Sequence, residues 1–528
     1  MASGNPLLTA VRVALVATLL SSAPMSVVFA QQAPETESLV VTPVRITSES
    51  GASQDAEQGI VFVKENRAVD DSRVIPIHFM RFAAEQPVKD RPPVFLVAGG
   101  PGSLYDFETD RHFEVAKRLR RTRDLVYVGQ RGNPREPVLV SPLYMEGLQR
   151  PLDKPSEPAT ERVVLREQLM TAQEHLTSLG IDLRGYDILN IVDDLYEVRA
   201  ALGYNKIALR GCSFGSQWSM SYMKRWPETV ERALLSGVEP LDYAYDDPRG
   251  LWNGFARLAT LAEADTDLAS DIPEGGIMQA LKTVIERLEE SPVSVELNTP
   301  DGSVIDVVVG AHDVRQALRY SYGQSRWERH ENWPKFILEM YNGDFRYLAA
   351  LAAEERSEAG RSTLIGVLID NSLGISSGRE AELLERNEAR WLGDINAYYR
   401  DTRDLTATQR VDDAFRADFR IDVPVLLVNG DIDWSTPLEN AEHELTQLDR
   451  GHLLRVNGAG HCPIAVELRD HKPELMEQVY RFFEADFSEN TDFFDTLPDS
   501  VDLPAYDFAT LNGPSLYEQA VNSLSEAR

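Results

Sequence analysis

Short apolar runs alternate with helical stretches between residues 93 and 235, and this alternation limits the possible fold more than any other feature of the sequence. Two parallel strands need a crossover between them, usually a helix, that returns the chain to the same edge of the sheet. The sequence therefore predicts an α/β fold with a mostly parallel central sheet flanked by helices. The predicted strands here are 93–98, 125–128, 206–209 and 233–235, and the predicted helices are 191–202 and 217–226.

The alternation is interrupted after Pro240 and resumes at residue 423. The intervening chain reads as mainly helical, with one hairpin predicted around the Asp301-Gly302 turn. We therefore expect a large, mainly helical cap inserted into one α/β domain. The predicted flanking elements are strands 39–46, 60–64 and 74–82 as an antiparallel edge, hairpin strands 293–297 and 304–309, strands 423–428 and 453–456, and helix 472–487. The predicted divisions are 1–30 signal peptide, 31–240 first part of the core, 241–420 cap, 421–490 second part of the core, and 491–528 an irregular tail.

The N-terminus has the pattern of a secretory signal peptide. Arg12 precedes the apolar run 13–20, and small residues at 28–30 provide a cleavage point before Gln31. The alternative is a transmembrane anchor, but the apolar run is short and Pro24 follows it. The sequence predicts an exported protein, periplasmic or secreted, that has no membrane segment after cleavage.

The chain of 528 residues has a formal net charge of -31 and a pI of about 4.7. Binding to nucleic acid or to an anionic membrane surface requires clustered Lys and Arg, so this balance argues against both partners. The two cysteines form no CxxC metal pattern. No metal site is therefore indicated by the cysteines, and the serine chemistry described below implies neither a metal nor an organic cofactor.

Residues 211–215 read Gly-Cys-Ser-Phe-Gly and fit G-x-S-x-G between a predicted strand and a predicted helix. A tight strand-to-helix turn lifts a serine hydroxyl out of the packing, and the flanking glycines let the backbone bend that sharply. The helix N-terminus also brings free N–H groups beside the serine oxygen. The pattern predicts Ser213 as a nucleophile.

Two later segments supply an acid and a base in the order Ser, Asp, His. His461 follows the glycine-containing loop 458–460, which leaves a base free to reach the serine. Asp433 follows a strongly apolar strand and can orient the imidazole and stabilise its charged form. Asp431 is the competing candidate for the same role.

An oxyanion site needs N–H donors where negative charge develops. The first predicted donor is the backbone N–H of Phe214, directly after the nucleophile. The second comes from the loop Gly99-Gly100-Pro101-Gly102, with Gly100 favoured over Gly99. The alternative for this loop is an ordinary turn.

With these motifs in order, the sequence resembles the prolyl aminopeptidase and tripeptidyl aminopeptidase family of serine peptidases, within the α/β-hydrolases. The resemblance covers about residues 60–485 and includes Gln130-Arg131-Gly132 and Asp193-Asp194-Leu195. It implies an α/β-hydrolase fold and an aminopeptidase that releases N-terminal residues from short peptides through an acyl-enzyme. Ala98 and Gly129 depart from the family pattern near the loops that shape the substrate entrance, as does Phe214.

The two cysteines carry a second resemblance. Cys212 directly precedes the predicted nucleophile and Cys462 directly follows the predicted base, an arrangement similar to that of tannases and feruloyl esterases. That resemblance implies a disulfide between Cys212 and Cys462, with two buried free thiols as the alternative. It also keeps a carboxylic ester hydrolase open as a second function, and a catalytically silent binding protein as a third.

The aminopeptidase resemblance implies that carboxylates of the cap bind the free α-amine of the substrate. Glu328 and Glu331, beside Trp327, are the predicted substrate-binding residues. The alternative is that these carboxylates are solvated charges on a helix.

Overall fold

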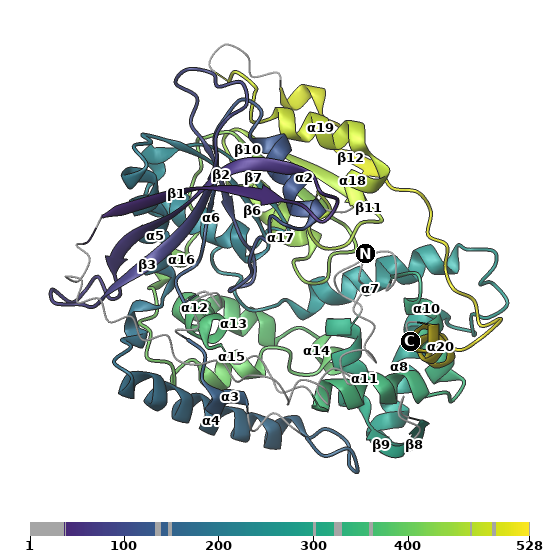
Figure 1. The fold of residues 1–528 in the computed structure, drawn as a ribbon. Helices are drawn as coiled ribbons and strands as arrows, with labels where there is room; N and C mark the ends of the chain where they lie inside the picture. Colours follow the sequence, from purple (N-terminus) through teal and green to yellow (C-terminus); the bar gives the residue numbers. More distant parts are fainter. Residues whose placement is uncertain are drawn as a thin grey trace.

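A ten-stranded sheet forms the centre of the structure (Figure 1). The computed structural model describes residues 36, 38–132, 139–145, 150–298, 303–321, 330–357, 363–464, 467–487 and 493–526. The strand order is β1-β2-β3-β5-β4-β6-β7-β10-β11-β12. The strands are β1 (Leu39–Thr47), β2 (Ser53–Lys64), β3 (Val74–Phe82), β4 (Val94–Val97), β5 (Leu125–Val128), β6 (Ile207–Cys212), β7 (Val230–Ser236), β10 (Val425–Gly430), β11 (Gly451–Asn457) and β12 (Ser500–Asp502).

The sheet is parallel from β5 to β12 and antiparallel among β1, β2, β3 and β5. The predicted mostly parallel sheet with an antiparallel edge is therefore confirmed. In such a sheet, loops at the carboxyl ends of neighbouring parallel strands meet at one edge, where ligands bind. β6, β7, β10 and β11 are neighbours in this part of the sheet, although β7 and β10 are far apart in the sequence.

Alternate residues of the central strands enter two separate hydrophobic cores. Phe95 and Val97 pack into one core, while Val94 and Leu96 pack into the other. Because side chains alternate across a strand, this division shows that both faces of the sheet are covered. The continuous apolar sequence of β4 has this physical cause, since neither of its faces meets water.

Helices from different parts of the chain cover the two faces (Figure 1). The first face packs on α5 (Ile188–Ala201) and α6 (Phe214–Arg225), and the second on α2 (Asp110–Leu119) and α19 (Pro473–Arg481). The helix predicted over 472–487 ends at Arg481, where turns follow. The helix predicted from Gln217 begins three residues earlier, at Phe214, directly after the serine.

The chain between β7 and β10 is mainly helical and has a hydrophobic core of its own. It contains the antiparallel hairpin of β8 (Val293–Asn298) and β9 (Val304–Val309), which confirms the predicted one. The boundaries of the predicted domains stay predictions.

The remaining α-helices of the described residues are α3 (Pro142–Met145), α4 (Pro158–Ser178), α7 (Pro248–Glu263), α8 (Gly276–Glu290), α9 (Ala311–Gln316), α10 (Trp333–Tyr341), α11 (Arg346–Ser357), α12 (Ile365–Leu373), α13 (Ser377–Leu384), α14 (Ala389–Leu392), α15 (Ala397–Thr402), α16 (Asp413–Arg416), α17 (Leu438–Leu445), α18 (Glu467–His471) and α20 (Leu516–Glu526).

The C-terminal tail is more regular than predicted. β12 adds a parallel strand to the edge of the sheet beside β11, and α20 packs against α11 in the helical part (Figure 1). Glu339 of α10 accepts hydrogen bonds from the backbone N–H of Leu516, the first residue of α20. The expectation of irregular structure was wrong because the partners of both elements lie far away in the sequence.

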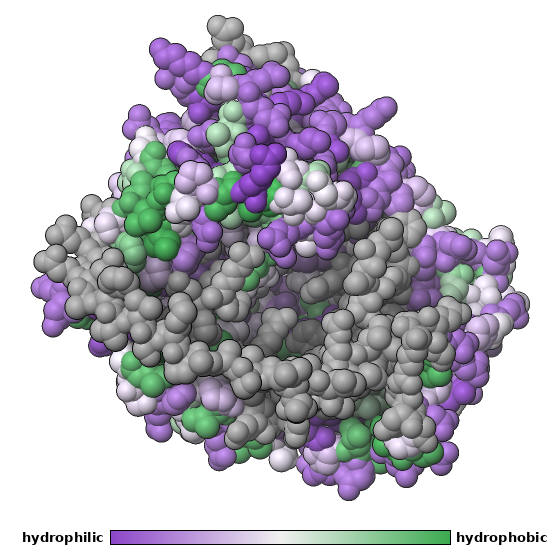
Figure 2. All heavy atoms as spheres, in the orientation of Figure 1, coloured by the Kyte–Doolittle hydropathy of each residue, from purple (hydrophilic) through white to green (hydrophobic). Residues whose placement is uncertain are grey.

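Where the face in Figure 2 is coloured, it is mainly hydrophilic, with a hydrophobic patch where β1 lies. Leu39, Val40 and Val41 on that edge strand are exposed. Among the described residues no helix is long and apolar enough to cross a membrane. The predicted signal peptide, residues 1–30, lies outside the described residues.

Candidate active site

Ser213 occupies a sharp turn between β6 and α6. Its backbone is in an unusual conformation, with φ 59° and ψ -135°, and its N–H donates to the carbonyl of Ser236 at 3.0 Å. A side chain on Gly211 would meet the carbonyl oxygen of Gly215 at 2.2 Å, and one on Gly215 would meet the carbonyl oxygen of Val97 at 2.5 Å. Both glycines are therefore required sterically, as the G-x-S-x-G pattern predicts.

His461 and Asp433 lie in contact at the ends of β11 and β10. His461 Nδ1 lies 2.8 Å from Asp433 Oδ2, and the Asp433 side chain is fully buried. The same carboxylate accepts hydrogen bonds from Thr436 Oγ1 at 2.6 Å and from the N–H groups of Thr436 and Ser435 at 2.8 and 2.9 Å. Asp433 is thus held as an acceptor for Nδ1–H, which leaves Nε2 of a neutral imidazole free to take a proton.

The competing carboxylate, Asp431, has a different partner. Its Oδ1 accepts the backbone N–H of Gly458 at 2.7 Å and so ties the end of β10 to the loop that precedes His461. Burial raises the pKa of Asp431. Of the two candidates, the structure brings Asp433 to the imidazole.

Two electrostatic effects on His461 act in opposite directions. Burial lowers the pKa of the imidazole, but the charge of Asp433 and its hydrogen bond raise it more, and Glu467 adds to the increase. The net result is a raised pKa, so the environment favours the imidazolium form that arises when the ring accepts a proton.

A disulfide between Cys212 and Cys462 joins the serine turn to the histidine loop. The bond links residues 250 positions apart, with Cα atoms separated by 6.1 Å. The predicted pairing is present, and the alternative of two free thiols is excluded. Because each cysteine is adjacent to Ser213 or His461, the bond limits how far these two residues can separate.

The glycine loop after β4 lies against the serine turn. A side chain on Gly99 would lie 3.4 Å from Ser213 Cβ and 4.0 Å from its Oγ. Gly100 has a φ of 111°, and a side chain there would meet the N atom of Gly102 at 2.6 Å. The first N–H groups of α6, beginning with Phe214, have no acceptor within the helix. The predicted oxyanion elements are therefore next to the serine.

Gln130 fixes this glycine loop, a role that the sequence did not reveal. Its Nε2 donates to the carbonyl of Gly99 at 3.1 Å, and its Oε1 accepts the N–H of Gly102 at 2.8 Å. An amide side chain that both donates and accepts holds the loop at two points. The motif Gln130-Arg131-Gly132 thus supports the active-site edge rather than forming part of the reacting group.

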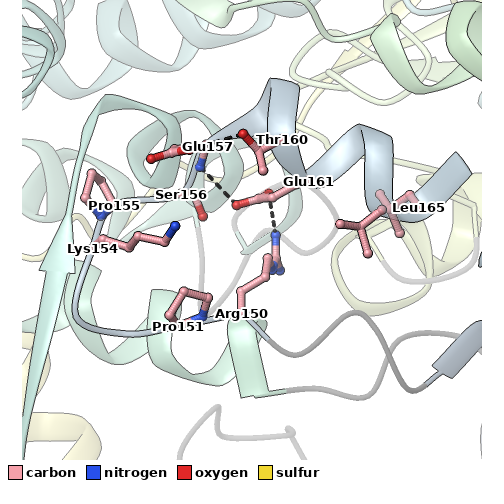
Figure 3. A pocket seen from close by; sticks show the side chains of 10 residues that line it. Arg150, Pro151, Lys154, Pro155, Ser156, Glu157, Thr160, Glu161 and Leu165 are labelled. Atoms are coloured by element: carbon pink, nitrogen blue, oxygen red, sulfur yellow. Dashed lines mark hydrogen bonds and ion pairs between the residues drawn. The ribbon is translucent and has the colours of Figure 1, made fainter. Parts of the chain in front are cut away.

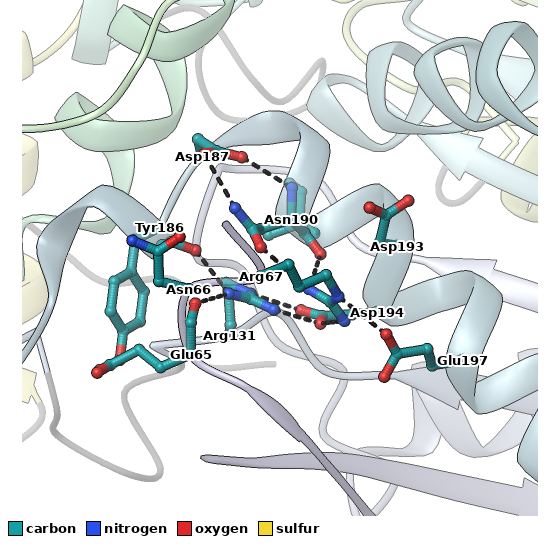
Figure 4. A network of polar contacts seen from close by, with 12 residues as sticks. Glu65, Asn66, Arg67, Arg131, Tyr186, Asp187, Asn190, Asp193, Asp194 and Glu197 are labelled. Atoms are coloured by element: carbon teal, nitrogen blue, oxygen red, sulfur yellow. Dashed lines mark hydrogen bonds and ion pairs between the residues drawn. The ribbon is translucent and has the colours of Figure 1, made fainter. Parts of the chain in front are cut away.

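Arg131 anchors the same segment inside the protein (Figure 4). Its guanidinium is buried and donates to Asp194 at 2.7 Å, to the carbonyl of Glu65 at 2.6 Å and to that of Gly185 at 2.5 Å. Asp194 also pairs with Arg67 at 2.7 Å. Burial would raise the pKa of Asp194, but Arg131 and Arg67 lower it, so the carboxylate stays charged. The two segments named in the family resemblance are therefore partners in one buried ion-pair network.

Ser213 and His461 line one cavity of about 740 Å³, together with Gly99, Gly100 and Phe214. This volume lies within the range of about 300–1,000 Å³ that is usual for small-molecule sites. The cavity wall also carries many charged side chains. They include the carboxylates Glu239, Asp246, Asp247 and Asp370 and the cations Arg111, Arg210 and Arg319, none of which was singled out from the sequence.

Glu239 and Asp370 are the carboxylates most affected by this environment. Burial and then the charges of Asp370 and Asp246 hold the pKa of Glu239 well above its usual range. Burial and the charge of Asp246 raise the pKa of Asp370 to about 8. Asp246 itself is paired with Arg319. Perturbed carboxylates in a cavity with a serine and a histidine are typical of a functional site.

Of the substrate-binding residues predicted from the sequence, only Glu331 is among the described residues, and it does not line this cavity. Trp327 and Glu328 lie outside the described residues. Glu331 lies against the C-terminal segment, where its carboxylate accepts the N–H of Asp507 at 3.2 Å and its carbonyl accepts that of Ala509 at 3.0 Å. Glu239 follows β7, and no pattern in the sequence indicates that its carboxyl group lines the serine cavity.

A second, smaller cavity of about 160 Å³ lies between the loop 150–157 and the start of α4 (Figure 3). Arg150 pairs with Glu161 at 3.0 Å, and Glu161 also accepts the N–H of Glu157 at 3.1 Å. The cavity shares no lining residue with the cavity around Ser213.

Comparisons with known proteins agree with the fold described above. A family model described as TAP-like protein matches residues 401–468, which include Asp433 and His461. No curated protein matches the sequence. This match and the ten-stranded sheet described above together identify the fold. The chain has the α/β-hydrolase fold.

Solved structures similar to this α/β-hydrolase are distant in sequence. A serine hydrolase, CCSP0084, from Cycloclasticus zankles is 13% identical, with 85% of this chain and 99% of that chain covered and a TM-score of 0.33. A meta-cleavage product hydrolase from Pseudomonas fluorescens is 14% identical, with 79% and 95% covered and a TM-score of 0.33. An esterase from Exiguobacterium antarcticum is 13% identical, with 78% and 94% covered and a TM-score of 0.31.

Proposed function

We propose that this α/β-hydrolase is a serine hydrolase that releases N-terminal residues from short peptides. Ser213 Oγ attacks the scissile carbonyl while His461 Nε2 takes its proton, and Asp433 holds the imidazole and stabilises its charge. The N–H groups of Phe214 and Gly100 receive the developing oxyanion. His461 then passes the proton to the leaving amine, and a water molecule activated by the same imidazole releases the acyl group.

The carboxylates Glu239 and Asp370 carry the peptide part of this proposal. They line the same cavity as Ser213, and their raised pKa values show that additional negative charge is costly there. A bound ammonium group would supply the opposite charge and stabilise the ionised carboxylates. The free α-amine at the start of a peptide is such a group, and its capture near the serine would direct cleavage to the first peptide bonds.

Replacement of Glu239 by Gln tests this step. We expect kcat/KM on alanine p-nitroanilide to fall about 10- to 100-fold, because a charged hydrogen bond contributes about 1.5–3 kcal/mol. The loss should be much smaller on an N-acetylated ester, which has no ammonium group. Glu228→Gln is the matched control, since Glu228 is exposed away from the cavity. Equal losses on both substrates would contradict the assignment of Glu239 to the amine.

The pH dependence of hydrolysis tests the base. His461 must be neutral to accept a proton, and its pKa is raised, so activity should be lost as the pH falls through a value above the usual 6.5 or so. An uncharged ester is the right substrate, because Glu239 and Asp370 would otherwise add their own titration. Asp433→Asn should lower kcat strongly and shift the acid limb of kcat/KM downward. An acid limb that does not move in this variant would count against Asp433 as the partner of the base.

A carboxylic ester hydrolase is the second candidate. The observation that favours it is the Cys212–Cys462 disulfide beside the nucleophile and the base, the arrangement that resembles tannases and feruloyl esterases. The same residues would act on an ester, whose leaving group needs less protonation. Alanine and proline p-nitroanilides, compared with p-nitrophenyl and phenolic esters, distinguish the two functions.

We also propose that the protein is exported. The apolar run 13–20 and the cleavage pattern at 28–30 support this, as does the disulfide, because such bonds persist in oxidising compartments. Mass spectrometry of the protein recovered from the periplasm or medium would locate the mature N-terminus, with Gln31 expected.

A further inference from the structure

Apart from the ion pair of Arg319 with Asp246, the cavity around Ser213 carries one acidic and one basic group of side chains. The acidic group consists of Glu239 and Asp370, with Asp246 beside them. The basic group consists of Arg111 and Arg210. A site for a ligand with a single charge would need only one of these groups.

The basic group lacks a matching carboxylate. Arg210 is only 4% exposed, and its Nη1 donates to Tyr105 Oη at 2.8 Å. Burial lowers the pKa of Arg210, but its interactions with Tyr105 and Tyr480 raise it, so the guanidinium stays charged beside neutral partners. Within the described residues Arg111 forms no ion pair. Desolvation and then repulsion by Arg469 and Arg210 lower the pKa of Arg111, and Tyr105 and Glu467 offset this only in part. An anion between these guanidinium groups would relieve the repulsion.

The acidic group is electrostatically separate from the basic one. The charges that act on Glu239 are those of Asp370, Asp246 and Asp433, all of them negative. Asp370 is also affected by burial and by Asp246, with a hydrogen bond from Tyr399 acting in the opposite direction. No arginine is among the charges that shift the pKa of Glu239 or of Asp370, although Arg111 and Arg210 line the same cavity.

The two groups reach the cavity from opposite faces of the sheet. Arg210 lies on the side of Tyr105 and Tyr480, which belong to the core covered by α2 and α19. Asp370 belongs to α12, which packs into the core on the other face, and Glu239 is flanked there by Val238. Ser213 stands at the end of β6, at the edge that separates these faces. A substrate that spans the cavity can therefore contact both groups while its carbonyl is at the serine.

We infer that the cavity selects short peptides with both ends free, binding the ammonium group at Glu239 and Asp370 and the terminal carboxylate at Arg111 and Arg210. The inference rests on the proposed peptidase function and adds a preference on the leaving-group side. Two guanidinium groups form charged hydrogen bonds with a terminal carboxylate. A C-terminal amide is neutral and cannot form them. The volume of about 740 Å³ suits a small ligand rather than a protein chain.

The direct test compares trialanine with trialanine amide as substrates of the unmodified protein, with the released alanine measured by chromatography. We expect kcat/KM to be about 10- to 100-fold higher for the free acid. In Arg111→Gln the ratio of the two values should approach one. Lys117→Gln, which removes an equal charge from an exposed part of the same helix, should keep the ratio of the unmodified protein.

The outcomes separate this inference from the proposed function. If both peptides are cleaved with equal kcat/KM, the carboxylate preference is wrong and the aminopeptidase proposal stands. If neither peptide nor alanine p-nitroanilide is cleaved while a fluorophosphonate probe still labels Ser213, the aminopeptidase proposal fails and this inference fails with it. The comparison of substrates needs no variant, so a misfolded Arg111→Gln protein would not prevent the test.

Discussion

Replacement of Ser213 by Ala should abolish hydrolysis, with kcat lower by roughly 10⁵- to 10⁶-fold, because no other group of the proposed relay can form the acyl-enzyme. The fold should be unaffected, since alanine retains the β-carbon and the serine hydroxyl is not required by the turn. Hydrolysis of a p-nitrophenyl ester and labelling by a fluorophosphonate probe measure the loss. Circular dichroism and thermal unfolding check that the structure persists.

Ser294→Ala is the matched control, because Ser294 is exposed on β8 and distant in sequence from the active-site loops. It should retain full activity and full labelling. If Ser213→Ala hydrolyses the ester at the rate of the unmodified protein, the nucleophile is another residue and the proposed mechanism is wrong.

Loss of the Cys212–Cys462 disulfide should destabilise the protein more than any surface substitution. The bond closes a loop across 250 positions, and the loop-entropy model gives an upper value of about 5 kcal/mol for a loop of this size. That is comparable to the whole stability of many domains. The double variant Cys212→Ala with Cys462→Ala should therefore unfold at a clearly lower guanidinium concentration.

The unmodified protein with reductant provides the matched comparison, since reduction opens the same bond without changing the packing of the side chains. Both samples should show similar shifts of the unfolding midpoint, and the double variant should not respond to reductant. If the oxidised and reduced proteins unfold at the same midpoint, the bond does not stabilise the native state.

The sheet could be predicted from the sequence because its strands follow a local pattern, and the same holds for the glycine-flanked turn at Ser213. The fully apolar runs of β4 and β5 indicate strands buried on two faces, and the turn around Ser213 requires glycine at fixed positions. Asp433 and His461 each follow a strand, so the parallel order of the strands implies that both lie at the sheet edge where Ser213 stands.

The charged wall of the cavity could not be predicted in the same way. Glu239, Asp370 and Arg111 come from three unrelated segments, and only the packing of α2 and α12 around the sheet brings them to one cavity. Glu331 had tryptophans near it in the sequence, but its partner is the C-terminal segment. β12 likewise depends on β11, a neighbour that no local pattern around Ser500 reveals.

The position of β10 and β11 beside β7 has a consequence for synthesis of the protein. In the proposed mechanism a nascent chain contains Ser213 long before Asp433 and His461 are translated, so it could not catalyse while it is still being made. Peptides in the compartment of synthesis would meet an inert polypeptide. Competence would arise only after the last strands dock, and oxidation of the two thiols would then make that docking hard to reverse.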